Sequence, residues 1–170
     1  MGQHLPAFAG RRWFVAHTKP RAEKKFAALL AHEKCAHYLA LVDSVRRYGG
    51  RTKTFTKPLF PGYVFVQIEG DQRQRLYQQD LLVRALPVEN EPVFLQQLET
   101  VRAVCASGLE AVLHPLIRKG TRVRVQGGPL HGVEGYVDDP LNPRGIVVSV
   151  DVLQQGLLVR LPLSSLQPLP

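Results

Sequence analysis

Positively charged side chains are concentrated in the first third of this 170-residue chain, and phosphate groups are natural partners for such side chains. Residues 1–57 contain 12 Lys or Arg against 3 Asp or Glu, residues 58–116 contain 4 against 7, and residues 117–170 contain 6 against 4. The net charge of +8 therefore comes from the N-terminal third. Most charged runs are only a solvated surface, but an excess confined to one segment favours nucleic-acid binding there. The candidate phosphate-contacting residues are Lys19, Arg21, Lys24, Lys25, His32, Arg46, Arg47, Arg51, Lys53 and Lys57.

No set of residues with catalytic spacing is recognisable in the sequence. It contains no phosphate-binding glycine loop, no Ser-centred nucleophile turn and no paired carboxylates. The nearest approach to a metal site is His32, Cys35 and His37, which offer three ligands where a structural zinc site needs four. Cys35 and Cys105 lie among alanine and apolar residues, which is typical of small buried thiols rather than of a disulfide. We therefore expect a protein that is not an enzyme and has no metal or cofactor.

The first basic residues lie on a predicted helix. Residues 13–17 have the composition of a strand, and Pro20 suits the first turn of the helix that follows. Apolar residues recur there at helical spacing, and a second, largely basic stripe runs beside them. The apolar stripe is Ala22, Phe26, Leu29 and Leu30, and the second stripe is Arg21, Lys25, Ala28 and His32.

The other basic residues lie on a predicted hairpin. Residues 38–42 and 44–48 look extended, Gly49-Gly50 supplies a turn, and residues 52–57 are prone to form a strand with basic side chains at alternate positions. This pattern predicts a long basic flap.

The remainder of the chain predicts a mixed α+β fold in two domains. Residues 63–68 form a β-branched and aromatic run typical of a central strand, and a short helix, a strand at 82–86 and a helix ending near Gly108 follow. Four short strands are then predicted at residues 122–125, 133–137, 146–152 and 157–161, which is enough for a small barrel. We expect a first domain of antiparallel sheet and flanking helices at 10–107, a linker at 108–118, and a β-barrel domain at 119–170.

Three strings of residues, in this order, resemble the NusG family of transcription factors over residues 12–169. The first is Trp13-Phe14-Val15 leading into Thr18-Lys19-Pro20-Arg21-x-Glu23-Lys24-Lys25, and the second, most specific, is Pro58-Leu59-Phe60-Pro61-Gly62-Tyr63-Val64-Phe65-Val66. The third, residues 119–135, is similar to the KOW motif, an SH3-like β-barrel signature that ribosomal proteins also use. The start at Thr18 looks more like the specialised paralogues, such as RfaH and UpxY, than the housekeeping protein.

The resemblance implies an NGN-like first domain that grips the clamp helices of the RNA polymerase large subunit in an apolar depression. Tyr63 and Phe65 match the aromatic positions of that depression, and the implied neighbours are Trp13, Phe14, Phe60 and Pro61. Because alternate strand residues face opposite ways, either this aromatic set or Val64 and Val66 must be core, and buried aromatics are commonplace. A second polymerase contact is implied at Arg73, Gln74 and Arg75.

The resemblance also implies contacts beyond the clamp. The basic residues would lie beside non-template DNA or nascent RNA, and the loop containing Pro129, Leu130 and His131 would recruit Rho or a ribosomal small-subunit protein. We therefore expect a cytoplasmic, monomeric elongation or antitermination factor that does not enter a membrane. The alternatives are a ribosome-associated or general RNA-binding KOW protein, and a housekeeping NusG that couples to Rho and the ribosome.

Overall fold

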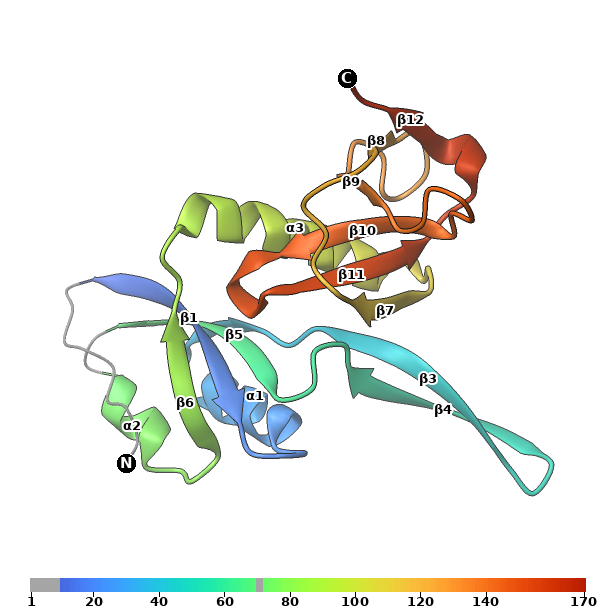
Figure 1. Ribbon diagram of the computed structural model, residues 1–170. Helices are drawn as coiled ribbons and strands as arrows, with labels where there is room; N and C mark the ends of the chain where they lie inside the picture. The colour runs from blue at the N-terminus through green and yellow to red at the C-terminus, as the bar shows by residue number, and fades with distance from the viewer. Residues whose placement is uncertain (1–9, 70–71) are drawn as a thin grey trace. The chain divides into compact units, whose positions relative to one another are not determined.

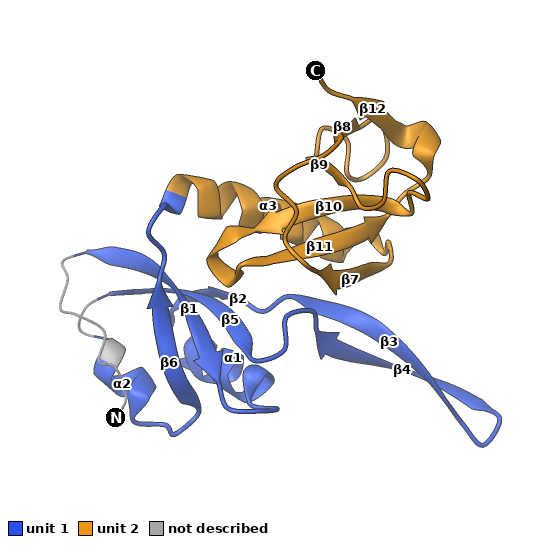
Figure 2. Cartoon of the chain, in the orientation of Figure 1, with its two compact units in different colours: residues 1–91 blue, residues 92–170 orange. Residues whose placement is uncertain are grey.

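The computed structural model describes residues 10–69 and 72–170, and the chain divides into two compact units, Met1–Glu91 and Pro92–Pro170 (Figure 2). Unit 1 contains β1 (Arg11–Thr18), α1 (Glu23–His32), β2 (Ala36–Tyr38), β3 (Leu41–Tyr48), β4 (Arg51–Pro58), β5 (Tyr63–Glu69), α2 (Arg73–Tyr77) and β6 (Leu82–Pro87). Its main sheet has the strand order β2-β5-β1-β6, with antiparallel pairing throughout, and β3 and β4 form a separate two-stranded hairpin (Figure 1).

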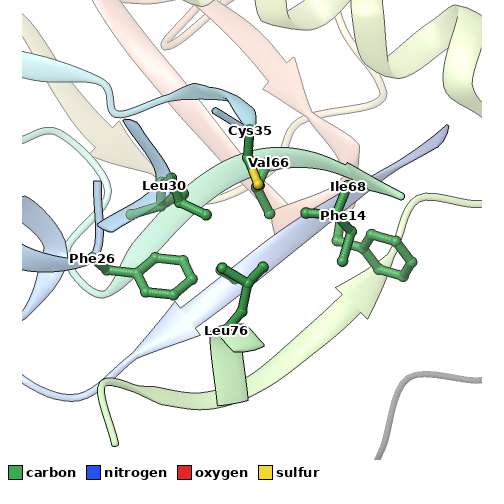
Figure 3. Packing of buried hydrophobic residues seen from close by; sticks show 9 residues of the cluster. Phe14, Phe26, Leu30, Cys35, Val66, Ile68 and Leu76 are labelled. Atoms are coloured by element: carbon green, nitrogen blue, oxygen red, sulfur yellow. The ribbon is translucent and has the colours of Figure 1, made fainter. Parts of the chain in front are cut away.

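One face of the main sheet forms the core of unit 1 with α1 and α2. Val64, Val66 and Ile68 of β5 alternate toward this side and pack with Phe26 and Leu30 of α1 (Figure 3). Phe14 and Ala16 of β1 and Leu76 of α2 belong to the same cluster, together with Cys35. Burial, reinforced by the Glu33 and Glu69 carboxylates, raises the pKa of the Cys35 thiol, so Cys35 is a packing residue, as the sequence predicted.

The N-terminal helix starts later than its apolar pattern predicts. Arg21 adopts φ +61°, a left-handed conformation that interrupts a helix, and α1 begins only at Glu23. Pro20 and Arg21 therefore belong to the turn before α1, and Arg21 is not part of the helical basic stripe.

Unit 2 consists of a long helix followed by a small β domain. Its elements are α3 (Glu91–Ser107, which starts on the last residue of unit 1), β7 (Ala111–His114), β8 (Arg122–Val125), β9 (Glu134–Val137), β10 (Gly145–Val150), η1 (Asp151–Leu153), β11 (Gln155–Arg160), η2 (Leu163–Ser165) and β12 (Leu166–Pro168). The six strands form one antiparallel sheet in the order β12-β8-β9-β10-β11-β7. The predicted α+β class and its small C-terminal β domain are confirmed.

The segment predicted as a linker, residues 108–118, is not irregular throughout. Ala111–His114 forms β7, which pairs with β11 from Gly156 to Val159. Four residues are too few for an alternating strand pattern to be recognised in the sequence. Pairing with β11 makes β7 an edge strand of the sheet. Within the described ranges, no helix combines the length and apolar character needed to span a bilayer.

Candidate partner and nucleic-acid surfaces

The turn before β5 joins the two N-terminal strings of residues that the sequence singled out. The backbone N–H of Thr18 donates to the Gly62 carbonyl at 2.8 Å, and the Gly62 N–H donates to Oε1 of Glu23 at 3.2 Å. Gly62 has φ +86°, and a Cβ there would lie 3.4 Å from Cδ2 of His17. Glu23, only 8% exposed, thus ties the first turn of α1 to the residue that precedes Tyr63. Sequence reasoning missed this role, although a carboxylate in the first turn of a helix was a visible signal.

Tyr63 and Phe65 lie on the sheet face opposite the core cluster, but only one of them is accessible. The Tyr63 ring is half-buried and stacks on His17, with 5.1 Å between centroids. Phe65 is 1% exposed, because Tyr38 stacks beside it at 6.5 Å and the edge of Phe60 meets it at 6.2 Å. Of the two aromatic positions that the sequence singled out on this face, Tyr63 is therefore the accessible one and Phe65 is buried.

The implied neighbours of Tyr63 divide between the two faces of the sheet. Trp13 pairs with Gln67 and is half-buried on the same face as Tyr63. Phe14 pairs with Val66 and is buried in the α1 cluster, so the expectation that it lies beside Tyr63 is wrong. Phe60 is also buried, whereas Pro61 is exposed at the turn.

The residues implied as a second polymerase contact lie at the start of α2. Arg73 begins this helix, and its side chain lies outside the described part of the structure. Gln74 is exposed, and Nη1 of Arg75 lies 3.5 Å from Oε2 of Glu33. Two of the three positions are thus on a polar, accessible stretch of helix.

Two of the basic residues near α1 are held by neighbouring elements. Nζ of Lys24 donates to the Thr56 carbonyl at 2.9 Å and to its hydroxyl oxygen at 3.0 Å, which ties α1 to β4. Nζ of Lys19 lies 2.6 Å from Oδ1 of Asp80. Lys25 and His32 are exposed on α1.

The β3–β4 hairpin sorts its basic residues onto two faces. The unbroken register places Arg46 opposite Lys53 and Tyr48 opposite Arg51, and alternation puts these four side chains on one face. Arg47 pairs with Thr52 on the other face, so it is separated from the other basic residues of the hairpin. Gly49 and Gly50 close the hairpin with φ values of +51° and +81°, which suits a two-residue primed turn.

The turn of the second domain that was predicted to recruit a partner exposes two of its three candidate residues. Leu130 is 1% exposed, because this apolar side chain turns into the β domain, so its expected place in the partner surface is wrong. Pro129 and His131 are exposed, and Nδ1 of His131 accepts a hydrogen bond from the Gly127 N–H at 2.7 Å.

A buried carboxylate organises the loop between β9 and β10. The Asp138 side chain is 1% exposed, and it accepts hydrogen bonds from the Arg144 N–H at 2.9 Å, Nε of Arg144 at 3.0 Å and the Gly145 N–H at 3.3 Å. Burial alone raises the pKa of Asp138, but the hydrogen bonds from Arg144, Gly145 and the Asp139 backbone outweigh it and lower that pKa.

The three potential metal ligands near the end of α1, His32, Cys35 and His37, lie in three different environments. Cys35 is buried in the core cluster, His32 is exposed, and Nδ1 of His37 lies 2.9 Å from the Cys35 carbonyl. In residues 10–69 and 72–170, no group of three or more His, Cys, Asp or Glu side chains is placed to hold a metal ion.

Comparisons with solved structures find similar chains of low identity. One described as "Domain interaction in Thermotoga maritima NusG" is 17% identical, with a TM-score of 0.48, and the match covers 95% of this chain and 98% of that one. Another, described as "Crystal Structure of MjSpt4:Spt5 complex conformation B", is 18% identical, with a TM-score of 0.32 and coverage of 92% and 95%.

Sequence comparisons identify the family. The transcription termination/antitermination protein NusG of Thermus thermophilus is 29% identical over an aligned length of 162 residues, and the match covers 82% of this chain and 88% of that protein. The family model described as "Transcription termination factor nusG" matches residues 11–104, more than half of the chain, including the turn at Gly62 and the Tyr63 face. The chain therefore belongs to the NusG family of transcription termination and antitermination factors.

Proposed function

We propose that this protein binds RNA polymerase through the face of the main sheet that carries Tyr63, with the tip of the clamp helices of the large subunit as its contact. The observation that carries the proposal is the partly exposed Tyr63 ring, which stacks on His17 directly after the turn held by Glu23. An aromatic ring fixed by its neighbours loses little side-chain entropy when a partner covers it, which is typical of interface hot spots. Phe65, on the same face of the strand, is buried and packs edge to face with Phe60.

The basic residues of unit 1 supply the second contact of the proposal. Lys25 and His32 on α1 and the β3–β4 hairpin would bind non-template DNA or nascent RNA beside the transcribing enzyme. Each neutralised phosphate should add about 0.9 to the log–log salt slope for duplex DNA and about 0.7 for a single strand. In the second unit, Pro129 and His131 would recruit Rho or a ribosomal small-subunit protein.

The proposed outcome is altered pausing or termination, with read-through of long operons as the expected direction. The accessible basic hairpin also suits a general RNA-binding or ribosome-associated protein, which would not need polymerase. In vitro transcription on a template with a defined terminator measures the effect directly. An unchanged fraction of read-through product at saturating protein would contradict the antitermination proposal.

Binding to purified core RNA polymerase separates the two functions. Tyr63→Ala should weaken binding about 30-fold, since the loss of an interface hot spot costs about 2 kcal/mol or more. Tyr63→Phe keeps the ring and should stay within a few-fold of the wild type. The emission of Trp13, the single tryptophan of the chain, verifies that each variant is folded.

The proposal fails if a folded Tyr63→Ala variant binds polymerase as tightly as the wild type. If the wild type does not bind polymerase but binds RNA, the general RNA-binding function replaces it.

A further inference from the structure

The β3–β4 hairpin has one face that combines aromatic and basic side chains, and all the charged side chains of this face are positive. Following the register, this face carries Val42, Ser44, Arg46 and Tyr48 from β3, and Arg51, Lys53, Phe55 and Lys57 from β4; we call it the hairpin basic face. The opposite face carries Asp43 and Arg47 among threonine and apolar side chains. The two faces therefore differ in charge and in aromatic content, although they share one short element.

The aromatic rings of the hairpin basic face are accessible. Tyr48 is 54% exposed and Phe55 is 37% exposed, and the two rings meet edge to face with 6.4 Å between centroids. Nζ of Lys53 lies over the Phe55 ring, 5.1 Å from its centroid, and so covers part of the face of that ring. Tyr48, beside the Gly49-Gly50 turn, is thus the more accessible of the two rings.

Contacts to phosphate alone do not account for these rings. A purely electrostatic surface gains nothing from exposed aromatics, which cost free energy in water. Rings interleaved with cationic side chains are the composition of surfaces that bind single-stranded nucleic acid, where bases stack on the rings and phosphates follow the charges. Arg51 and Lys53 recur at every second residue of β4, so their charges form a row along the strand.

We propose that the hairpin basic face binds single-stranded nucleic acid, with an unpaired base stacked on Tyr48 and phosphates contacted by Arg46, Arg51 and Lys53. This inference rests on the nucleic-acid contact proposed above and deepens it, because it assigns the strandedness of the ligand and the residue that recognises it. Bases in a duplex already stack on one another and present no free ring face to Tyr48. Stacking is available to every base, so the preference is for strandedness rather than for sequence.

Fluorescence anisotropy of the full chain with a labelled 12-nucleotide strand, without polymerase, tests the proposal. Tyr48→Ala should weaken binding to the single strand about tenfold and leave the salt slope unchanged, because stacking involves no counterion release. The duplex of the same sequence should bind more weakly than the single strand, and its affinity should not depend on Tyr48. DNA and RNA versions of the strand show which of the two the face prefers.

Two adjacent arginines provide a matched pair for the phosphate contacts. Arg46→Gln should lower the log–log salt slope by about 0.7, since it removes one phosphate contact to a single strand. Arg47→Gln removes the same charge from the opposite face and should leave the slope unchanged. Both residues are exposed, so both variants should keep the wild-type unfolding midpoint measured by Trp13 emission.

The proposal is overturned if Tyr48→Ala binds the single strand as tightly as the wild type, or if the duplex binds at least as well as the single strand. Equal salt slopes for Arg46→Gln and Arg47→Gln would overturn the assignment of the face. Polymerase is absent from this measurement, so its failure is distinct from a failure of polymerase binding by the Tyr63 face.

Discussion

Replacing Glu23 should loosen the turn that positions Tyr63, and the structure allows the cost to be worked out. A hydrogen bond from a backbone N–H to a charged acceptor stabilises by about 1.5–3 kcal/mol, and a carboxylate in the first turn of a helix adds about 0.3–1 kcal/mol. Glu23→Ala loses both, so the free energy of unfolding should fall by about 2–4 kcal/mol. Glu23→Gln keeps an oxygen that can accept from the Gly62 N–H, and it should cost only about 1–2 kcal/mol.

Urea denaturation followed by Trp13 emission measures this cost in unit 1 alone, because the only tryptophan of the chain lies in β1. With a slope of about 1 kcal/mol per molar urea for a unit of this size, the midpoint should fall by about 2–4 M for Glu23→Ala and 1–2 M for Glu23→Gln. Glu89→Gln removes the same charge from an exposed position and is the control. The reasoning is refuted if neither Glu23 variant shifts the midpoint further than Glu89→Gln does.

Three further substitutions test other contacts. Asp138→Asn should lower the free energy of unfolding of the β domain by about 2 kcal/mol at pH 7, as thermal unfolding by circular dichroism would show. Because folding lowers the pKa of Asp138, the stability that this carboxylate contributes is fully present above about pH 3.9 and is lost as the pH falls through its folded-state pKa. The Asn variant should therefore depend less on pH than the wild type. Gly145→Ala should prevent the β domain from forming, since a Cβ would lie 1.9 Å from the Val159 carbonyl oxygen, and dispersed amide resonances of the domain should disappear. Lys24→Met should speed hydrogen exchange near Thr56 while global stability stays within about 0.5 kcal/mol.

Each of these substitutions has a matched control in the chain. Asp139→Asn removes the charge of the neighbouring, exposed carboxylate and keeps an oxygen that can accept from the Leu141 N–H, so it should retain the pH dependence that Asp138 contributes. Gly128→Ala introduces a side chain at φ +73° with open space around it and should cost only about 1–2 kcal/mol. Lys25→Met alters the next, exposed residue of α1, and equal exchange rates for the two lysine variants would contradict the tether to β4.

Periodicity predicted the elements well where a face is buried along their whole length. Alternation in residues 63–68 separates Val64, Val66 and Ile68 from Tyr63 and Phe65, and the structure has the same division. Alternation could also have shown that Trp13 and Phe14 cannot both lie on the Tyr63 face, because they are adjacent in a strand and must face opposite ways. The sequence could not show which of the two pairs with Gln67, since register is set by tertiary pairing.

The remaining misses come from single residues in turns and from contacts between distant segments. Leu130 lies in a glycine-rich turn, and such turns usually lie on the surface. Its side chain is nevertheless buried in the β domain. The left-handed backbone of Arg21 has no sequence signature in a residue that usually favours helix. The tie between Glu23 and Gly62 spans 39 positions, and only coordinates bring such partners together.

The first turn of α1 links the two surfaces proposed for unit 1. Glu23 holds the turn at Gly62 that precedes Tyr63, and the next residue, Lys24, holds Thr56 near the base of the hairpin. The base is further fixed where the Leu59 N–H donates to the Ala40 carbonyl at 2.8 Å, so the whole connection from hairpin to β5 is anchored. Tyr63 and Tyr48 both lie on segments that these contacts hold in place. Replacing Glu23 and Lys24 together should therefore weaken both polymerase binding and nucleic-acid binding, whereas replacing Tyr63 or Tyr48 should weaken only one of the two.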